Sequence, residues 1–293
     1  MGPECNLCDH PAPNETNMNR RILWRSAAIV PLLVVAAAAS TSLPLPKIPY
    51  RVEDPGDVQA RYELLAGSAD SAGLQDLWRD QPGSALTTFD ADLERSLALR
   101  EKSPEQPPLA EIAALHDRAL LAARAASDAL GTPIFADYAS AFVGWSAQEQ
   151  RDFRDGQMIV KEAHKLLAEG EAMRAQQLAQ DAIDRTAYLG DWWGNAMAYA
   201  VRGRAQQASS SFQHALTSYA QARLIYSQLH LTGSEFTNLH RMVNMLVLLE
   251  HWPRAQVACE AALRMAPGAG AAENTVAELE RARAKIDKAL GAD

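Results

Sequence analysis

The sequence contains little cysteine, few aromatic residues and few strand-forming runs. Three cysteines are too few for a disulfide framework, and aromatic residues make up only 6% of the chain. Runs of valine, isoleucine and threonine are almost absent after the first 50 residues. Hydrophobic residues nevertheless reach 48%, and alanine supplies much of that fraction. Because alanine has the highest helix propensity and lets helix axes approach closely, we expect an all-α fold.

Catalytic and cofactor motifs are also missing. The sequence has no P-loop, no glycine-rich dinucleotide fingerprint, no HExxH zinc motif and no GxSxG nucleophile turn. Cys5, Cys8 and His10 have the spacing of half a zinc site, but no second pair of ligands is nearby. We therefore expect no catalytic site, no metal and no cofactor. The net charge of −8 argues against a nucleic-acid partner.

The beginning of the chain has the order of an export signal. Three arginines come first: Arg20, Arg21 and Arg25. An uncharged stretch of apolar and small residues follows them, about long enough to span a bilayer. We therefore predict a signal peptide or membrane anchor at residues 18–42, preceded by a disordered leader or start-site extension at residues 1–17. If the signal is not cleaved, residues 22–43 hold the protein in the membrane.

The charges around this segment predict its orientation. Arginines precede it and acidic residues follow it at Glu53, Asp54 and Asp57, so the positive-inside rule places the rest of the chain outside. Residues 43–56 are rich in proline, which favours extended backbone and indicates a linker. We expect an exported protein, either anchored on the periplasmic side of a bacterial-type inner membrane or periplasmic or secreted after cleavage.

Residues 57–155 are predicted to form an irregular helical lead-in region, in which short amphipathic pieces are separated by glycine and proline. Residues 109–130 carry apolar side chains at helical spacing and end before Gly131, a residue type typical of helix C-termini. Further along, Trp192 and Trp193 come directly after a glycine–aspartate pair. This order indicates the start of a helix rather than a platform on which a sugar or base stacks.

The second half of the chain repeats with a period of 40 residues. Small residues recur at this interval at two points of each copy: Ala175, Ala215 and Ala255, then Ala182, Ala222 and Ala262. Self-similarity at such a period is typical of stacked helix pairs, in which small residues lie where two helices cross closely. We therefore predict helical repeats over residues 156–270, followed by a capping helix over residues 271–293.

Each copy resembles a tetratricopeptide repeat. The third copy, residues 238–267, matches best: it has the family's order of large apolar, small and aromatic positions, with Pro267 at its end. Gln206 and Glu250 depart from that pattern. The resemblance covers about residues 156–269 and implies a right-handed α-solenoid of helical hairpins. Since the family's usual period is about 34 residues, the longer period implies longer second helices, as in kinesin-light-chain-like arrays.

The family resemblance also implies a binding surface. In this family the first helix of each pair lines a concave face, which here presents these predicted partner-binding residues: Lys161, His164, Arg204, Gln207, His240, Arg241 and Asn244. The set carries three full positive charges and no acid. The implied partner is an acidic peptide or a C-terminal carboxylate, held by charge-assisted hydrogen bonds. The alternative, in which these are ordinary solvated charges, stays open.

We accordingly expect a non-catalytic scaffold or adaptor of the cell envelope that binds another protein. The main alternative is a regulatory or accessory subunit of an envelope enzyme, for example a peptidase complex. Residues 131–196 resemble helical regions that precede caspase-like peptidase domains in bacterial repeat proteins, although the sequence contains no such domain. An unrecognised hydrolase and a homo-oligomer whose copies stack end to end are the remaining alternatives.

Overall fold

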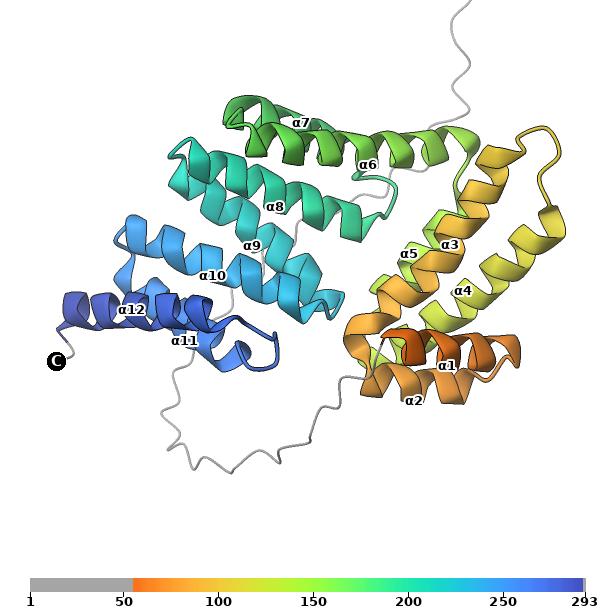
Figure 1. Ribbon diagram of the computed structural model, residues 1–293, viewed down its shortest axis with the longest axis horizontal. Coiled ribbons are helices and arrows are strands. Elements are labelled where there is room, and N and C mark those ends of the chain that lie inside the picture. The colour runs from red at the N-terminus through yellow and green to blue at the C-terminus, as the bar shows by residue number, and fades with distance from the viewer. Residues whose placement is uncertain (1–54, 292–293) are drawn as a thin grey trace, which may run out of the picture. The chain divides into compact units, whose positions relative to one another are not determined.

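The computed structural model describes residues 55–291, so the predicted leader, signal and most of the linker lie outside the described residues. Within this range the chain has twelve α-helices, one short 3-10 helix and no strand, which confirms the all-α prediction. The first part contains α1 (Pro55–Gly67), α2 (Ser71–Asp80), η1 (Pro82–Ser84), α3 (Ala85–Lys102), α4 (Leu109–Leu130) and α5 (Ile134–Gly144) (Figure 1). The second part contains α6 (Ala147–Ala168), α7 (Ala172–Thr186), α8 (Trp192–Ala208), α9 (Phe212–Gln228), α10 (Thr232–Leu248), α11 (Trp252–Met265) and α12 (Glu273–Leu290).

The first five helices and the start of α6 enclose an aromatic core. Trp78 and Phe89 are fully buried in it, and the indole of Trp78 donates to the carbonyl of Ala122 at 3.2 Å. The same core includes Leu189 and Leu229, which lie in the connections after α7 and α9. The region predicted as a lead-in therefore packs against the helices that follow it, and the described part of the chain belongs to one compact unit.

From α6 onward, each helix packs against the one before and the one after it (Figure 1). Helices α7, α9 and α11 begin at intervals of 40 residues, so the predicted period is present in the helix boundaries. Alanines at the predicted interval, among them Ala175 and Ala215, are fully buried. Where α8 crosses α9, the small residue Gly203 makes room for the large side chain of Tyr219. A Cβ atom at position 203 would lie only 2.7 Å from the tyrosine ring.

The turns between these helices recur every 20 residues. The backbone has a positive φ at six regularly spaced positions: Gly170, Gly190, Ser210, His230, Glu250 and Gly270. After Gly170, Ser210 and Glu250, the next amide donates to the carbonyl five residues earlier, as in the Schellman motif that closes helix C-termini. These short connections reverse the chain, so consecutive helices pack antiparallel.

The turns at Ser210 and Glu250 predict that glycine stabilises the fold at both positions. Their φ values of 58° and 56° are unfavourable for any residue with a Cβ atom. Ser210→Gly and Glu250→Gly are each expected to raise the free energy of unfolding by about 0.5–1 kcal/mol, measured by urea denaturation. Ser209→Gly is the matched control, because Ser209 has an ordinary φ of −88° and glycine there should destabilise. The same loss at Ser209 and Ser210 would contradict the left-handed turn.

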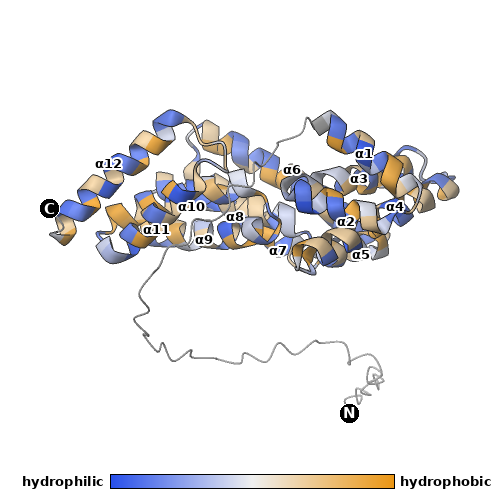
Figure 2. Cartoon of the chain, turned by 90° about the horizontal axis from the view of Figure 1, so that it is seen from below, coloured by the Kyte–Doolittle hydropathy of each residue, from blue (hydrophilic) through white to orange (hydrophobic). Residues whose placement is uncertain are grey.

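Hydrophilic and hydrophobic residues are interleaved along the helices (Figure 2). In helix α12, Leu279 and Ile286 are fully buried in a core that also contains Cys259. A helix is therefore present where the C-terminal capping helix was predicted. No helix within residues 55–291 combines the length and the apolar content needed to cross a membrane.

Arg154 of α6 is bonded to α3. Its guanidinium donates to Glu94 at 2.5 Å and to both carboxylate oxygens of Glu101 at 2.7 and 3.3 Å. Gln157 donates to the other oxygen of Glu94 at 2.8 Å. Because the side chain of Arg154 is only 26% exposed, these ion pairs are partly shielded from water and contribute more than surface pairs do.

Loss of Arg154 is expected to destabilise the protein. Arg154→Ala should lower the free energy of unfolding by about 2 kcal/mol, because it leaves two neighbouring carboxylates without their cation. The matched control is Arg151→Ala: this arginine is exposed and forms no ion pair with the described residues, so its loss should cost less than about 0.5 kcal/mol. Urea unfolding followed by circular dichroism measures both. Equal effects would show that Arg154 does not join α6 to α3.

Candidate partner-binding face

The predicted partner-binding residues are divided among α6, α8 and α10: Lys161 and His164, then Arg204 and Gln207, then His240, Arg241 and Asn244. Helix α6 packs against α8, and α9 lies between α8 and α10 along the chain and packs against both. Side chains from the three helices can therefore meet over α9. Four of the seven residues lie in one group: His164, Arg204, Gln207 and Arg241. The other three, Lys161, His240 and Asn244, lie beside this group.

His164, Arg204 and Arg241 form a group that we call the cationic cluster. Nη1 of Arg204 lies 3.3 Å from Nδ1 of His164. The guanidinium of Arg241 stands over the ring of Tyr219, 5.8 Å from its centroid. The Tyr219 hydroxyl donates in turn to Oε1 of Gln207 at 2.7 Å. Tyr219 belongs to α9, so a prediction based on the first helix of each pair did not include it.

The cationic cluster has no balancing carboxylate in the described part of the chain. Neither Arg204 nor Arg241 forms an ion pair with any residue between 55 and 291. Burial lowers the pKa of Arg204, and the charge of Arg241 lowers it further. Burial and the charge of Arg204 also lower the pKa of His164, so its imidazole is neutral at pH 7. The two guanidinium charges repel each other, and an anion would stabilise both.

His240 and Asn244 lie next to α12. Nε2 of His240 is 3.3 Å from Oε2 of Glu278, and Nδ2 of Asn244 is 3.4 Å from the same imidazole nitrogen. Burial lowers the pKa of His240, whereas the charge of Glu278 raises it. Glu278 is an acid that the predicted set lacks, because it comes from α12 and not from a first helix. His240 therefore already has a carboxylate partner, which the arginines of the cationic cluster lack.

A small apolar cleft adjoins the cationic cluster between α6 and α8, and we call it the central cleft. Its volume is about 280 Å³, and its lining includes Gly156, Val160, Lys161, His164, Gly194 and Met197. Asp191 also lines it, and its carboxylate accepts from the amide of Gly194 at 2.9 Å. This bond caps α8, which begins at Trp192 as predicted. The central cleft can hold an apolar side chain next to an anion bound by the cluster.

Two buried carboxyl groups interact across α3 and the start of α8. Asp90 accepts a hydrogen bond from the hydroxyl of Tyr138 at 2.5 Å, and burial raises the pKa of Asp90 to about 7. Burial also raises the pKa of Asp191 to about 6, and the charge of Glu94 acts on both in the same direction. Folding therefore favours the protonated form of each carboxyl group.

A serine and a histidine lie in contact elsewhere but do not form a nucleophile and its base. Ser96 Oγ is 2.8 Å from Nε2 of His116, yet the serine is 1% exposed and its hydroxyl donates to the carbonyl of Leu93. A serine that is buried to this degree and bonded to its own helix is poorly placed to act as a nucleophile. Cys259 is buried, and burial raises the pKa of its thiol. Within residues 55–291 no group of three or more potential ligands could hold a metal.

The face therefore combines two guanidinium groups that lack a carboxylate partner with an adjoining apolar cleft. A guanidinium donates two parallel hydrogen bonds to one carboxylate, and desolvation strengthens that contact. An acidic group followed by an apolar side chain has the chemistry that this face would recognise. The chain matches no protein-family model, and no curated protein matches it.

Proposed function

We propose that the protein is a non-catalytic adaptor of the cell envelope that binds an acidic segment of another protein through the face formed by α6, α8 and α10. The cationic cluster carries this proposal. Arg204 and Arg241 are close enough for one charge to lower the pKa of the other, and neither has an acid among the described residues. A carboxylate partner removes this repulsion and accepts charge-assisted hydrogen bonds. An acidic side chain or a C-terminal carboxylate meets this requirement.

The proposal includes a tetratricopeptide-like, right-handed solenoid built from the helix pairs α6–α7, α8–α9 and α10–α11, with the first helices on the concave side. Three observations support it: helices that pack in chain order, turns that recur every 20 residues, and buried small residues at the 40-residue interval. Helix α12 acts as the cap, since Leu279 and Ile286 cover the apolar side of the last pair.

Each residue of the face has a separate role in the proposed complex. Arg204 and Arg241 hold the carboxylate, and Gln207 and Lys161 donate further hydrogen bonds beside it. The central cleft takes an apolar side chain of the same segment. His240 and Asn244 join the interface when their contact with Glu278 opens.

The proposed location is outside a bacterial-type inner membrane. The protein is anchored there through residues 22–43 or released after cleavage of the signal, and these residues lie outside the described range. The partner is a protein and not a nucleic acid, because the net charge of −8 repels phosphate beyond the local basic face. A homo-oligomer with end-to-end stacking is the alternative, and its self-association would persist after the charges of the cationic cluster are removed.

Peptide titration of the full chain in detergent tests the proposed function. The probes are fluorescent peptides that end in Leu-Asp-Asp with a free carboxylate, and matched peptides in which both aspartates are asparagine. The acidic peptide is expected to bind at least about tenfold more tightly, and its affinity should fall as salt is added. An amidated acidic peptide shows whether the terminal carboxylate is needed. Equal binding of the acidic and amide peptides would contradict the proposal.

A further inference from the structure

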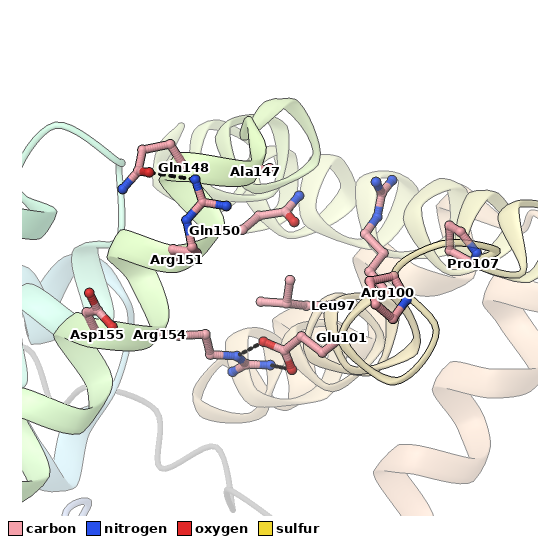
Figure 3. A pocket seen from close by; sticks show the side chains of 11 residues that line it. Leu97, Arg100, Glu101, Pro107, Ala147, Gln148, Gln150, Arg151, Arg154 and Asp155 are labelled. Carbon is pink, nitrogen blue, oxygen red and sulfur yellow. Dashed lines mark hydrogen bonds and ion pairs between the residues drawn. The ribbon is translucent and has the colours of Figure 1, made fainter.

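A second, larger cleft lies between the end of α3, the connection to α4 and the start of α6; we call it the N-terminal cleft. Its volume is about 620 Å³. Its apolar lining consists of Leu97, Pro104, Pro107 and Ala147. Figure 3 shows Arg100 and Arg151 on opposite sides of this cleft, with Leu97 between them. One arginine comes from α3 and the other from α6, so the N-terminal helices and the repeat region build the cleft together.

Three arginines and two acids line the N-terminal cleft. Its two acids are already paired, Glu101 with Arg154 at 2.7 Å and Asp155 with Arg185 at 3.0 Å. Arg151 donates to the neutral side chain of Gln148 at 2.6 Å. Neither Arg151 nor Arg100 forms an ion pair with any residue of the described range. Arg100 and Arg151 are therefore the two arginines of the lining that have no carboxylate partner in the described range.

One face of α6 connects the N-terminal cleft with the cationic cluster. Side chains at helical spacing occupy that face: Gln150, Arg154, Gln157, Lys161 and His164. The first two line the N-terminal cleft, and the last three line the central cleft. Nη1 of Arg154 donates to Oε1 of Gln157 at 2.9 Å, so the two sets are in direct contact. The rise along α6 separates Arg151 from His164 by about 20 Å.

We propose that the N-terminal cleft is a second anion subsite, which Arg100 and Arg151 add to the concave face from outside the repeats. It binds the far end of the same partner segment, an extended peptide with acidic groups at both ends and apolar side chains between them. An extended chain covers about 20 Å in about six residues, so the two subsites select segments of at least this length. This inference rests on the proposed function of the cationic cluster.

Two synthetic peptides of different length test the second subsite. Each carries two Asp-Glu pairs, which are either directly adjacent or separated by six residues of glycine, serine and leucine, so that the outermost acids of an extended chain lie about 10 Å or about 30 Å apart. The full chain is expected to bind the longer peptide about tenfold more tightly, because only that peptide reaches both subsites. Arg100→Glu/Arg151→Glu should remove this advantage while changing the affinity for the shorter peptide by no more than about twofold.

The outcomes separate this inference from the proposed function. If Arg100→Glu/Arg151→Glu leaves both affinities unchanged while Arg204→Glu/Arg241→Glu abolishes both, the second subsite is wrong and the cationic cluster stands. If neither double variant weakens binding, the proposed function is wrong as well. Arg174→Glu/Arg254→Glu is the matched control, since it makes the same change in net charge at exposed positions of α7 and α11. An equal loss in this control would assign the effect to net charge and overturn the second subsite.

Discussion

Replacement of Arg204 and Arg241 together by glutamate is expected to weaken binding of an acidic segment by at least about 100-fold. The two guanidinium groups form no ion pair with a carboxylate of the described residues. Their replacement removes two charge-assisted contacts and adds two repulsive charges. Fluorescence anisotropy with the Leu-Asp-Asp peptide measures the change in the dissociation constant.

This effect should occur without loss of the fold. The single variant Arg204→Glu replaces a repulsive pair by an attractive one, because the new carboxylate faces Arg241. Its thermal unfolding should therefore match or exceed that of the wild type. The control Arg174→Glu/Arg254→Glu keeps the net charge equal to that of the double variant and should retain binding. A double variant that unfolds, or a control that binds equally poorly, would contradict a specific role for the cluster.

The substitution Asp90→Asn is expected to stabilise the protein more strongly at pH 8 than at pH 5. Burial raises the pKa of Asp90 from 3.8 to about 7. At a pH between 3.8 and about 7, Asp90 keeps its proton in the folded protein but has lost it in the unfolded chain. The contribution of Asp90 to stability therefore increases as the pH falls. Asparagine stays neutral throughout and keeps an oxygen for the hydroxyl of Tyr138. The advantage of the variant over the wild type should be roughly 2–3 kcal/mol larger at pH 8.

The comparison with the wild type at each pH cancels the contributions of titrating groups that do not interact with Asp90. Burial lowers the pKa of half-buried His230 and His240, which therefore act on stability in the opposite direction over part of the same range. Asp137→Asn is the matched control, because Asp137 is exposed and loses the same charge. Urea denaturation at both pH values measures the free energies of unfolding. A variant whose advantage does not depend on pH would show that Asp90 is not a buried acid.

The sequence allowed the helical class and the period to be predicted because both depend on local patterns. Alanine content and helical spacing indicate helices wherever they occur, and buried small residues such as Ala175 and Ala215 mark helix crossings. The start of α8 was also predictable from the glycine and aspartate before Trp192. The left-handed turns at Ser210 and Glu250 were harder to predict, because neither position holds the glycine or asparagine that usually adopts a positive φ.

The composition of the candidate face depended on contacts that no local pattern encodes. Glu278 reaches His240 from α12, and Tyr219 approaches Arg241 from α9. Asp90 bonds to Tyr138 across a separation of 48 positions. Spacing within one helix shows which residues share a face but not which side chains another helix brings to it. The resemblance to tetratricopeptide repeats therefore implied a basic face and did not indicate its neighbours.

The N-terminal helices illustrate the same distinction. Their short amphipathic segments predicted an irregular helical region, and helices α1 to α5 occupy it. Nothing in the local pattern indicated that Leu189 and Leu229 join their core, or that Arg154 binds Glu101. These contacts link the region to the repeats, and they bring Arg100 and Arg151 to one cleft.

Photocrosslinking in the cells that produce this protein tests whether another protein binds at the cationic cluster. A benzophenone amino acid is placed at Gln207, beside the cationic cluster, or at Val257, which is 67% exposed on α11. We expect a discrete adduct with another protein from Gln207 that disappears in the Arg204→Glu/Arg241→Glu background, and no such adduct from Val257. An adduct from Gln207 that persists in the charge-reversed background, or the same adduct from Val257, would contradict binding through the face formed by α6, α8 and α10.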